Sequence, residues 1–150
     1  MEVFRITKEA YAKELRASGV ANRWNLDRQN VIYAGGSRSL ATLELVVHRS
    51  YVMPTQSYKV MVITISDDAN VVTQLDTNDL PTDWRSFDAY PALQKLGADW
   101  YNQKQSVVLK VPSAVISKEH NFVINTEHPD FVARVQLTTT EDYFWDERLL

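Results

Sequence analysis

The stretch YKVMVITIS, residues 58–66, carries the clearest structural signal in this chain. Its apolar and β-branched residues occupy consecutive positions rather than alternate ones, which is typical of a strand that is covered on both faces. We therefore expect it to lie in the middle of a sheet. Further strands are predicted by short β-branched or alternating runs at residues 3–6, 31–33, 71–75, 106–111, 121–125 and 131–137.

Helical runs alternate with these predicted strands. They are residues 8–17 behind the capping candidate Thr7, residues 40–50 behind Ser37 or Ser39, and a run from Pro91 that carries Leu93, Leu96 and Trp100 on one side. Because helices and strands are intermixed, with strands clustered toward the end, the predicted class is α+β. We expect a single mixed domain over residues 1–150, with a central, mainly antiparallel sheet flanked by helices.

Composition narrows the functional classes. The chain has no cysteine, which excludes disulfides, thiolate metal sites and cysteine nucleophiles. Its net charge is -3 and its Lys and Arg residues are scattered, which argues against a surface that binds nucleic acid directly. The N-terminus lacks the apolar run of a signal peptide, and no stretch is long enough to span a membrane. We therefore expect a cytoplasmic protein that is not bound to a membrane.

Glu44 is the most informative single residue. At about 100° per residue it falls on the same side of its predicted helix as Leu40, Leu43 and Val47, so its carboxylate is directed toward the core. Burying a carboxylate without a partner costs several kcal/mol, so a basic group, hydrogen bonds or protonation must compensate. Alternatively, Glu44 lies at the edge of the apolar stripe and reaches solvent, or pairs with His48 one turn later. The pattern by itself leaves both interpretations open.

Other chemical signals are weaker. Residues 33–39, YAGGSRS, place two glycines before a helix, which suits an anion site or a plain turn, but match no phosphate-binding motif. Ser113 follows a predicted strand without the G-x-S-x-G pattern, so a seryl hydrolase is not indicated. The spacing of the three histidines predicts no metal site, with ordinary hydrogen-bonded side chains as the alternative: His48, His120 and His128.

Several blocks of the sequence, taken together, resemble a known family. In order and spacing, FRI (4–6), NRWN (22–25), VIYAGGSRSLATLELVVH (31–48), VPSAVI (111–116) and NFVINTEHPDF (121–131) are similar to the RES domain, which is named for its arginine, glutamate and serine. The resemblance runs over nearly the whole chain. The chain departs from the usual pattern at Ala21 and Asn22, where a glycine pair is usual, and at residues 26–30, LDRQN, which lack an expected glycine.

The resemblance implies a function. RES proteins are toxins of bacterial toxin–antitoxin pairs, neutralised by an Xre-type antitoxin with a helix-turn-helix, and their fold resembles that of ADP-ribosyltransferases. They destroy NAD+ by hydrolysis or phosphorolysis of the nicotinamide–ribose bond, and some relatives transfer ADP-ribose to a protein. NAD+ is then a substrate rather than a cofactor, and a homodimer within the toxin–antitoxin complex is a further expectation. The alternatives are an ADP-ribosyltransferase with a protein target and a non-catalytic RES-fold protein that binds a nucleotide or a partner.

The family's functional residues can be carried over by position. The resemblance implies four catalytic residues: Arg23, Tyr33, Glu44 and Ser113. The residues expected to bind NAD+ are Arg5, Arg23, Tyr33 and Asn125, of which Arg5 and Asn125 are the weaker candidates. A guanidinium suits a diphosphate, and a fixed carboxylate suits the oxocarbenium character that develops when the glycosidic bond breaks. The tyrosine could stack on nicotinamide or ribose, and the serine could hydrogen-bond phosphate, ribose or the attacking water.

Overall fold

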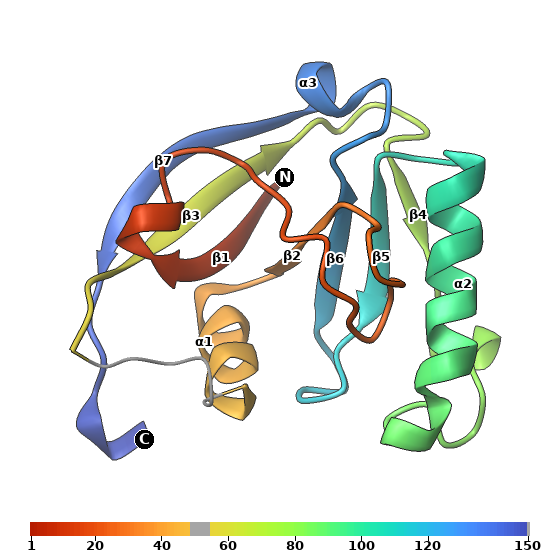
Figure 1. Cartoon of the computed structure of the whole chain (residues 1–150), viewed down its shortest axis with the longest axis horizontal. Helices are drawn as coiled ribbons and strands as arrows, with labels where there is room; N and C mark the ends of the chain where they lie inside the picture. Colours follow the sequence, from red (N-terminus) through yellow and green to blue (C-terminus); the bar gives the residue numbers. More distant parts are fainter. Residues whose placement is uncertain (49–54, 150) are drawn as a thin grey trace.

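A bent sheet organises the part of the chain that the structure describes, residues 1–48 and 55–149 of a computed structural model. Its strand order is β4-β5-β6-β2-β1-β3-β7 (Figure 1). Neighbouring strands are antiparallel except for the parallel pair β4 and β5, which confirms the predicted α+β class and the mainly antiparallel sheet. The strands are β1 (Glu2–Lys8), β2 (Val31–Gly35), β3 (Tyr58–Ile65), β4 (Val72–Gln74), β5 (Val108–Pro112), β6 (His120–Asn125) and β7 (Val135–Tyr143).

The helices are short apart from two. They are α1 (Arg38–Val47), α2 (Tyr90–Gln103) and α3 (Phe131–Arg134), with the 3-10 helices η1 (Glu9–Tyr11), η3 (Thr77–Asp79), η4 (Phe87–Ala89) and η5 (Glu147–Leu149). Of the two candidate caps of α1, it is Ser37 whose Oγ accepts a hydrogen bond from the backbone N–H of Leu40 at 3.0 Å. Pro91 lies in the first turn of α2, as predicted. The helix predicted at residues 40–50 corresponds to α1, and its predicted last two residues, 49–50, lie outside the described residues.

The apolar run at residues 58–66 forms β3, which pairs with β1 on one side and β7 on the other. Its alternate residues enter two different cores. Met61 and Ile63 pack in the cluster that contains Ile32 and Ile124. Val60 and Val62, on the opposite face, pack beneath α1. The prediction of a strand covered on both faces is therefore confirmed.

Two predicted elements are wrong. The helix expected at residues 8–17 is replaced by the end of β1 and a single 3-10 turn. Lys8 pairs with Tyr58, and the backbone N–H of Glu9 donates to Ser57 O at 2.9 Å. Backbone groups that would form the first hydrogen bonds of a helix therefore bond to the neighbouring strand and the residue before it. In the predicted strand 131–137, the first four residues form α3, and the strand begins only at its fifth residue.

Both long helices cover the same face of the sheet. Phe4 packs with Ala41 of α1, and Phe4 is paired with Gly35 of β2, which is paired in turn with Asn121 of β6. Directly opposed residues of antiparallel strands share a face, and so do residues two apart along a strand. Val123 therefore lies on this face too, where it packs against α2. Asn121 consequently lies between the areas covered by α1 and α2.

The sheet bends between its two halves. β1 and β2 share a single paired position, and β1, β3 and β7 run obliquely to the direction of β5 and β6 (Figure 1). The other face is filled by the largest apolar cluster, against which the segment after η1 packs with Ala12, Leu15 and Ala17. No helix within residues 1–48 and 55–149 is long and apolar enough to cross a membrane.

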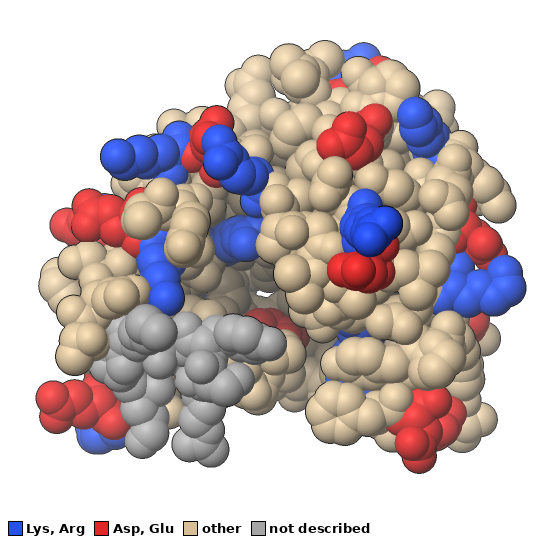
Figure 2. All heavy atoms as spheres, viewed as in Figure 1, with Lys and Arg blue, Asp and Glu red and all other residues tan. Residues whose placement is uncertain are grey.

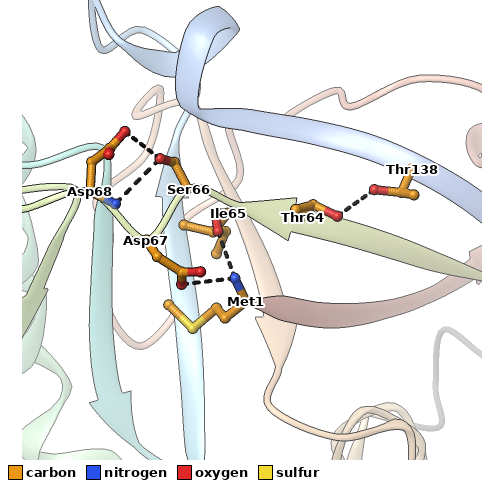
Figure 3. Close-up of polar contacts among 7 residues, drawn as sticks. All are labelled: Met1, Thr64, Ile65, Ser66, Asp67, Asp68 and Thr138. Atoms are coloured by element: carbon orange, nitrogen blue, oxygen red, sulfur yellow. Dashed lines mark hydrogen bonds and ion pairs between the residues drawn. The ribbon is translucent and has the colours of Figure 1, made fainter.

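The N-terminal amine is tied to the end of β3. Met1 N donates to Ile65 O at 2.8 Å and to the Asp67 carboxylate at 3.0 Å, as Figure 3 shows. On the other side of β3, the hydroxyls of Thr64 and Thr138 hydrogen-bond each other across to β7. These contacts help fix the register of β1, β3 and β7, the strands on which α1 packs.

Candidate active site

The Glu44 carboxylate is held by two side chains from the sheet. Its Oε1 accepts a hydrogen bond from Ser113 Oγ at 3.0 Å and another from Asn121 Nδ2 at 2.6 Å. Both donors therefore act on one carboxylate oxygen. Among the described residues, none donates a hydrogen bond to Oε2, so that oxygen is available to a ligand.

The surroundings of Glu44 combine parts of both interpretations left open by the sequence. Leu40 is fully buried, but Val47 is 57% exposed and Leu43 is only partly buried, so Glu44 lies at the edge of the apolar stripe. Its partners come from β6 and the end of β5 rather than from His48 one turn later. Among the residues that the structure describes, hydrogen bonds rather than a basic group compensate for its partial burial.

Ser113 follows β5 and is fully buried. Its Oγ accepts hydrogen bonds from the backbone N–H groups of Val115 and Ile116, each at 3.0 Å. A hydroxyl has one hydrogen and two lone pairs, so these two bonds leave the hydrogen for Glu44. The Ser113 hydroxyl thus directs its only hydrogen at the carboxylate and has no lone pair left for a substrate.

Asn121 was not singled out from the sequence. It stands in β6, opposite Gly35 of β2, and its side chain lies on the face covered by α1 and α2. A weak signal was present, because Asn121 lies two residues before the buried Val123 and must share its face. Only the packing of α1 reveals that its partner is Glu44.

Arg23 is anchored to the segment that leads into α2. Its Nη1 donates to Trp84 O at 3.1 Å and to Arg85 O at 3.4 Å, and its guanidinium lies over the ring of Tyr90, 4.7 Å from the centroid. Its Nε and Nη2 groups donate to none of the described residues. Arg23 therefore combines a structural role with free donors.

Tyr33 is tied to the same loop as Arg23. Its hydroxyl donates to Asn25 Oδ1 at 2.5 Å and accepts from Trp24 N at 3.1 Å. Burial raises the pKa of Tyr33, while the Trp24 hydrogen bond and the nearby Arg23 oppose this rise more weakly. The phenol is therefore a neutral group engaged within the protein, and its partly buried ring is the part that could contact a ligand.

The structure brings the four principal candidates to one face of the sheet. Tyr33 is paired with Val123, two residues from Asn121, so Tyr33 and Asn121 are diagonal neighbours with Cα atoms roughly 7–8 Å apart. Glu44 lies beside this pair because it accepts a hydrogen bond from Asn121, and Ser113 donates to the same oxygen of Glu44. Figure 2 shows a hollow near the centre of the face in view, between the positions of α1 and of β2 and β6 in Figure 1, with acidic atoms beside it.

The two weaker candidates lie apart from Glu44. Arg5 alternates with Phe4 along β1, so its side chain points away from α1. Burial lowers the pKa of Arg5, and its side chain forms no hydrogen bond or ion pair with the described residues. Asn125 is fully buried at the opposite end of β6 from Asn121. Its amide donates to Tyr101 O at 3.4 Å and its Oδ1 accepts from Glu127 N at 2.9 Å, so it shapes the turn after the strand.

A surface cavity of about 520 Å³ lies elsewhere, beside β7. It is lined by Lys13, Lys59 and residues 138–140 among others, and it contains none of the candidate residues. We therefore place the candidate site by its side-chain chemistry, between α1 and α2.

The loop after Arg23 adopts a turn that favours glycine without containing one. Arg28 has a φ of 68°, and its backbone N–H donates to Gly19 O at 2.7 Å. This residue lies in the LDRQN stretch, where the RES pattern suggested a missing glycine. The backbone thus adopts the left-handed conformation there at an arginine, a conformation that glycine would adopt without strain.

Replacing Arg28 with Gly is therefore expected to stabilise the protein. The left-handed conformation costs a residue with a Cβ about 1 kcal/mol relative to glycine, and the side chain of Arg28 is exposed. Urea unfolding would measure the gain. Arg28→Ala keeps the Cβ and provides the control, and equal unfolding midpoints for Arg28→Gly and Arg28→Ala would contradict the prediction.

Comparisons with known proteins identify the family to which this chain belongs. The RES domain family model matches residues 2–146. The chain is 29% identical to "Toxin Res" of Yersinia enterocolitica over 99% of both chains, and 30% identical to "Prs ADP-ribosylating toxin" of a Sphingobium species over 93% of this chain and 88% of that protein. Its fold is similar to a chain of the M. tuberculosis MbcT-MbcA toxin-antitoxin complex, with a TM-score of 0.76 and 20% identity over 95% of this chain and 84% of that one. The chain therefore belongs to the RES domain family.

Proposed function

We propose that this protein is the toxin of a toxin–antitoxin pair and that it cleaves the nicotinamide–ribose bond of NAD+. The observation that carries the proposal is the Glu44 carboxylate, which Ser113 and Asn121 fix through one oxygen, while no described residue donates to the other. Membership of the RES domain family and relatives named "Toxin Res" support the toxin role.

A fixed carboxylate suits this reaction. Breaking the bond develops positive charge on the ribose, and a carboxylate already in place stabilises that charge more in the transition state than in the ground state. Hydrogen bonds from Ser113 and Asn121 hold this carboxylate in place. Glu44 Oε2 would face the ribose. Nicotinamide is already a good leaving group, so a second carboxylate acting as general acid is not required.

Arg23 and Tyr33 would bind the rest of the substrate. The free Nε and Nη2 donors of Arg23 form a fork that suits a diphosphate. The hydroxyl of Tyr33 is engaged by Trp24 and Asn25, which leaves its ring to contact nicotinamide or ribose. Arg5 and Asn125 would act outside this group if they contribute to binding.

The direct test is to incubate the purified protein, free of any antitoxin, with NAD+ and to measure free nicotinamide. We expect nicotinamide release together with ADP-ribose if water is the acceptor, or its phosphorylated product if inorganic phosphate is required. Binding of NAD+ without any release would contradict the proposed reaction and would instead indicate a nucleotide-binding protein.

ADP-ribosylation of a protein is a second candidate, favoured by the name of the Sphingobium relative. Both reactions break the same bond and differ in the acceptor. NAD+ labelled in its adenylate part, added to a cell lysate with the protein, separates them. Label fixed on protein indicates transfer, whereas label only in small molecules indicates degradation.

We also propose an antitoxin partner of the Xre type, with a helix-turn-helix. Support comes from the similar fold found in a toxin-antitoxin complex. Co-expression with the product of a neighbouring small helix-turn-helix gene should give a complex that copurifies and no longer releases nicotinamide. The mass of that complex would show whether it contains two copies of this chain.

A further inference from the structure

The packing of α1 on β2 brings Glu44 to Asn121. A Cβ added at Gly35 would lie 3.0 Å from Ala41 N and 3.3 Å from Ala41 Cα, so the helix backbone rests almost directly on the strand at this point. Gly35 is the residue paired with Asn121. Because the position beside Asn121 carries no side chain, the carboxylate one turn along α1 from Ala41 can reach the Asn121 amide.

Asn121 provides a rigid attachment for that carboxylate. Its strand, β6, is hydrogen-bonded on both sides, to β2 and to β5, and Asn121 is paired with Gly35 on one side and Val111 on the other. Ser113, the second donor, follows directly on β5, and its backbone N–H donates to Glu119 O at 3.0 Å. Both donors are thus fixed by the sheet rather than by a free loop.

The two hydrogen bonds together select one orientation of the carboxylate. Since both end on Oε1, rotating the carboxylate by a half-turn would only exchange equivalent oxygens, whereas moving it away from the sheet would break both bonds. The bond from Asn121, at 2.6 Å, is the shorter of the two. Charge-assisted hydrogen bonds of this kind are short and strong.

We propose that Asn121 is a positioning residue that holds the Glu44 carboxylate in place with Oε2 directed at the ribose. The inference rests on the proposed function for its catalytic consequence. The contact between the two side chains can be tested without any substrate.

The substitution Asn121→Asp tests the contact because it conserves shape and replaces the amide donor with a carboxylate. Labelling glutamate side-chain carboxyls with carbon-13 allows the protonation of Glu44 to be followed by NMR. In Asn121→Asp we expect the midpoint of the Glu44 titration to rise by about one pH unit or more, a tenfold increase in proton affinity. Asn102→Asp adds the same charge at an exposed position of α2 and should leave the midpoint in place.

Asn121→Ala provides a second variant that adds no charge. It should also raise the Glu44 midpoint, and it should lower kcat for nicotinamide release by about ten- to a hundredfold while KM stays within about twofold of wild type. A residue with only a packing role would affect stability but would move neither the midpoint nor kcat.

The two measurements separate the two proposals. An unchanged Glu44 midpoint in both folded Asn121 variants overturns the positioning role, whatever the activity. A folded Asn121→Ala variant with the kcat of wild type overturns it as well. If the midpoint moves but the wild type releases no nicotinamide, the contact is established and the proposed reaction fails.

Discussion

Replacing Glu44 with Gln is expected to lower kcat for nicotinamide release by about a hundred- to a thousandfold and to leave the fold intact. The amide has the shape of the carboxylate, and its oxygen can still accept the hydrogen bonds of Ser113 and Asn121. It carries no charge, so the positive ribose of the transition state loses its stabilising partner. Expression of the variant without an antitoxin should accordingly be tolerated by cells.

The measurement is the initial rate of nicotinamide release at saturating NAD+, with circular dichroism to verify the fold. Glu147→Gln removes the same charge from an exposed residue of η5 and is the matched control. A Glu44→Gln variant with wild-type activity would show that the carboxylate is not required and would remove the main support for NAD+ cleavage at this site.

Replacing Gly97 with Ala is expected to cause the largest loss of stability, about 3 kcal/mol or more. A Cβ at this position of α2 would lie 1.7 Å from Trp24 O and 2.7 Å from Trp24 C, both of which are backbone atoms. In a solvent-exposed helix the same change would stabilise the protein by about 1 kcal/mol. Here the clash with Trp24 outweighs that gain, so the substitution lowers the free energy of unfolding. Either α2 or the loop that carries Arg23 must move.

Urea unfolding with tryptophan fluorescence would measure the loss. Gly36→Ala is the matched control, because among the described residues its Cβ would meet His120 O at 3.2 Å and Phe122 at 3.5 Å, without any contact below 3 Å. Any folded fraction of Gly97→Ala should also bind NAD+ more weakly, since Arg23 precedes the displaced Trp24. An unfolding midpoint equal to that of the control would show that helix and loop are not in close contact.

Local signals in the chain predict several elements correctly. The continuous apolar run at residues 58–66 identifies β3, and Pro91 with its apolar stripe identifies α2. The segment at residues 8–17 shows the limit of such signals. Its residues favour a helix, but pairing of Lys8 with Tyr58 extends β1, and the chain then packs Ala12 against the apolar face of the sheet. Tertiary burial outweighs helix propensity, which amounts to less than about 1 kcal/mol per residue.

For the candidate site too, the sequence indicates some features and only the structure shows the others. The family motif in the sequence identifies Glu44, Ser113, Arg23 and Tyr33, because each stands in a short block that can be recognised without coordinates. The partners of Glu44 lie 69 and 77 residues away along the chain, and one of them, Asn121, was not foreseen. A contact at that separation depends on strand register and on how closely α1 packs on Gly35, and neither is encoded by local propensity. Residue chemistry therefore follows from the sequence, whereas the sharing of one oxygen of Glu44 by two donors is decided by tertiary packing.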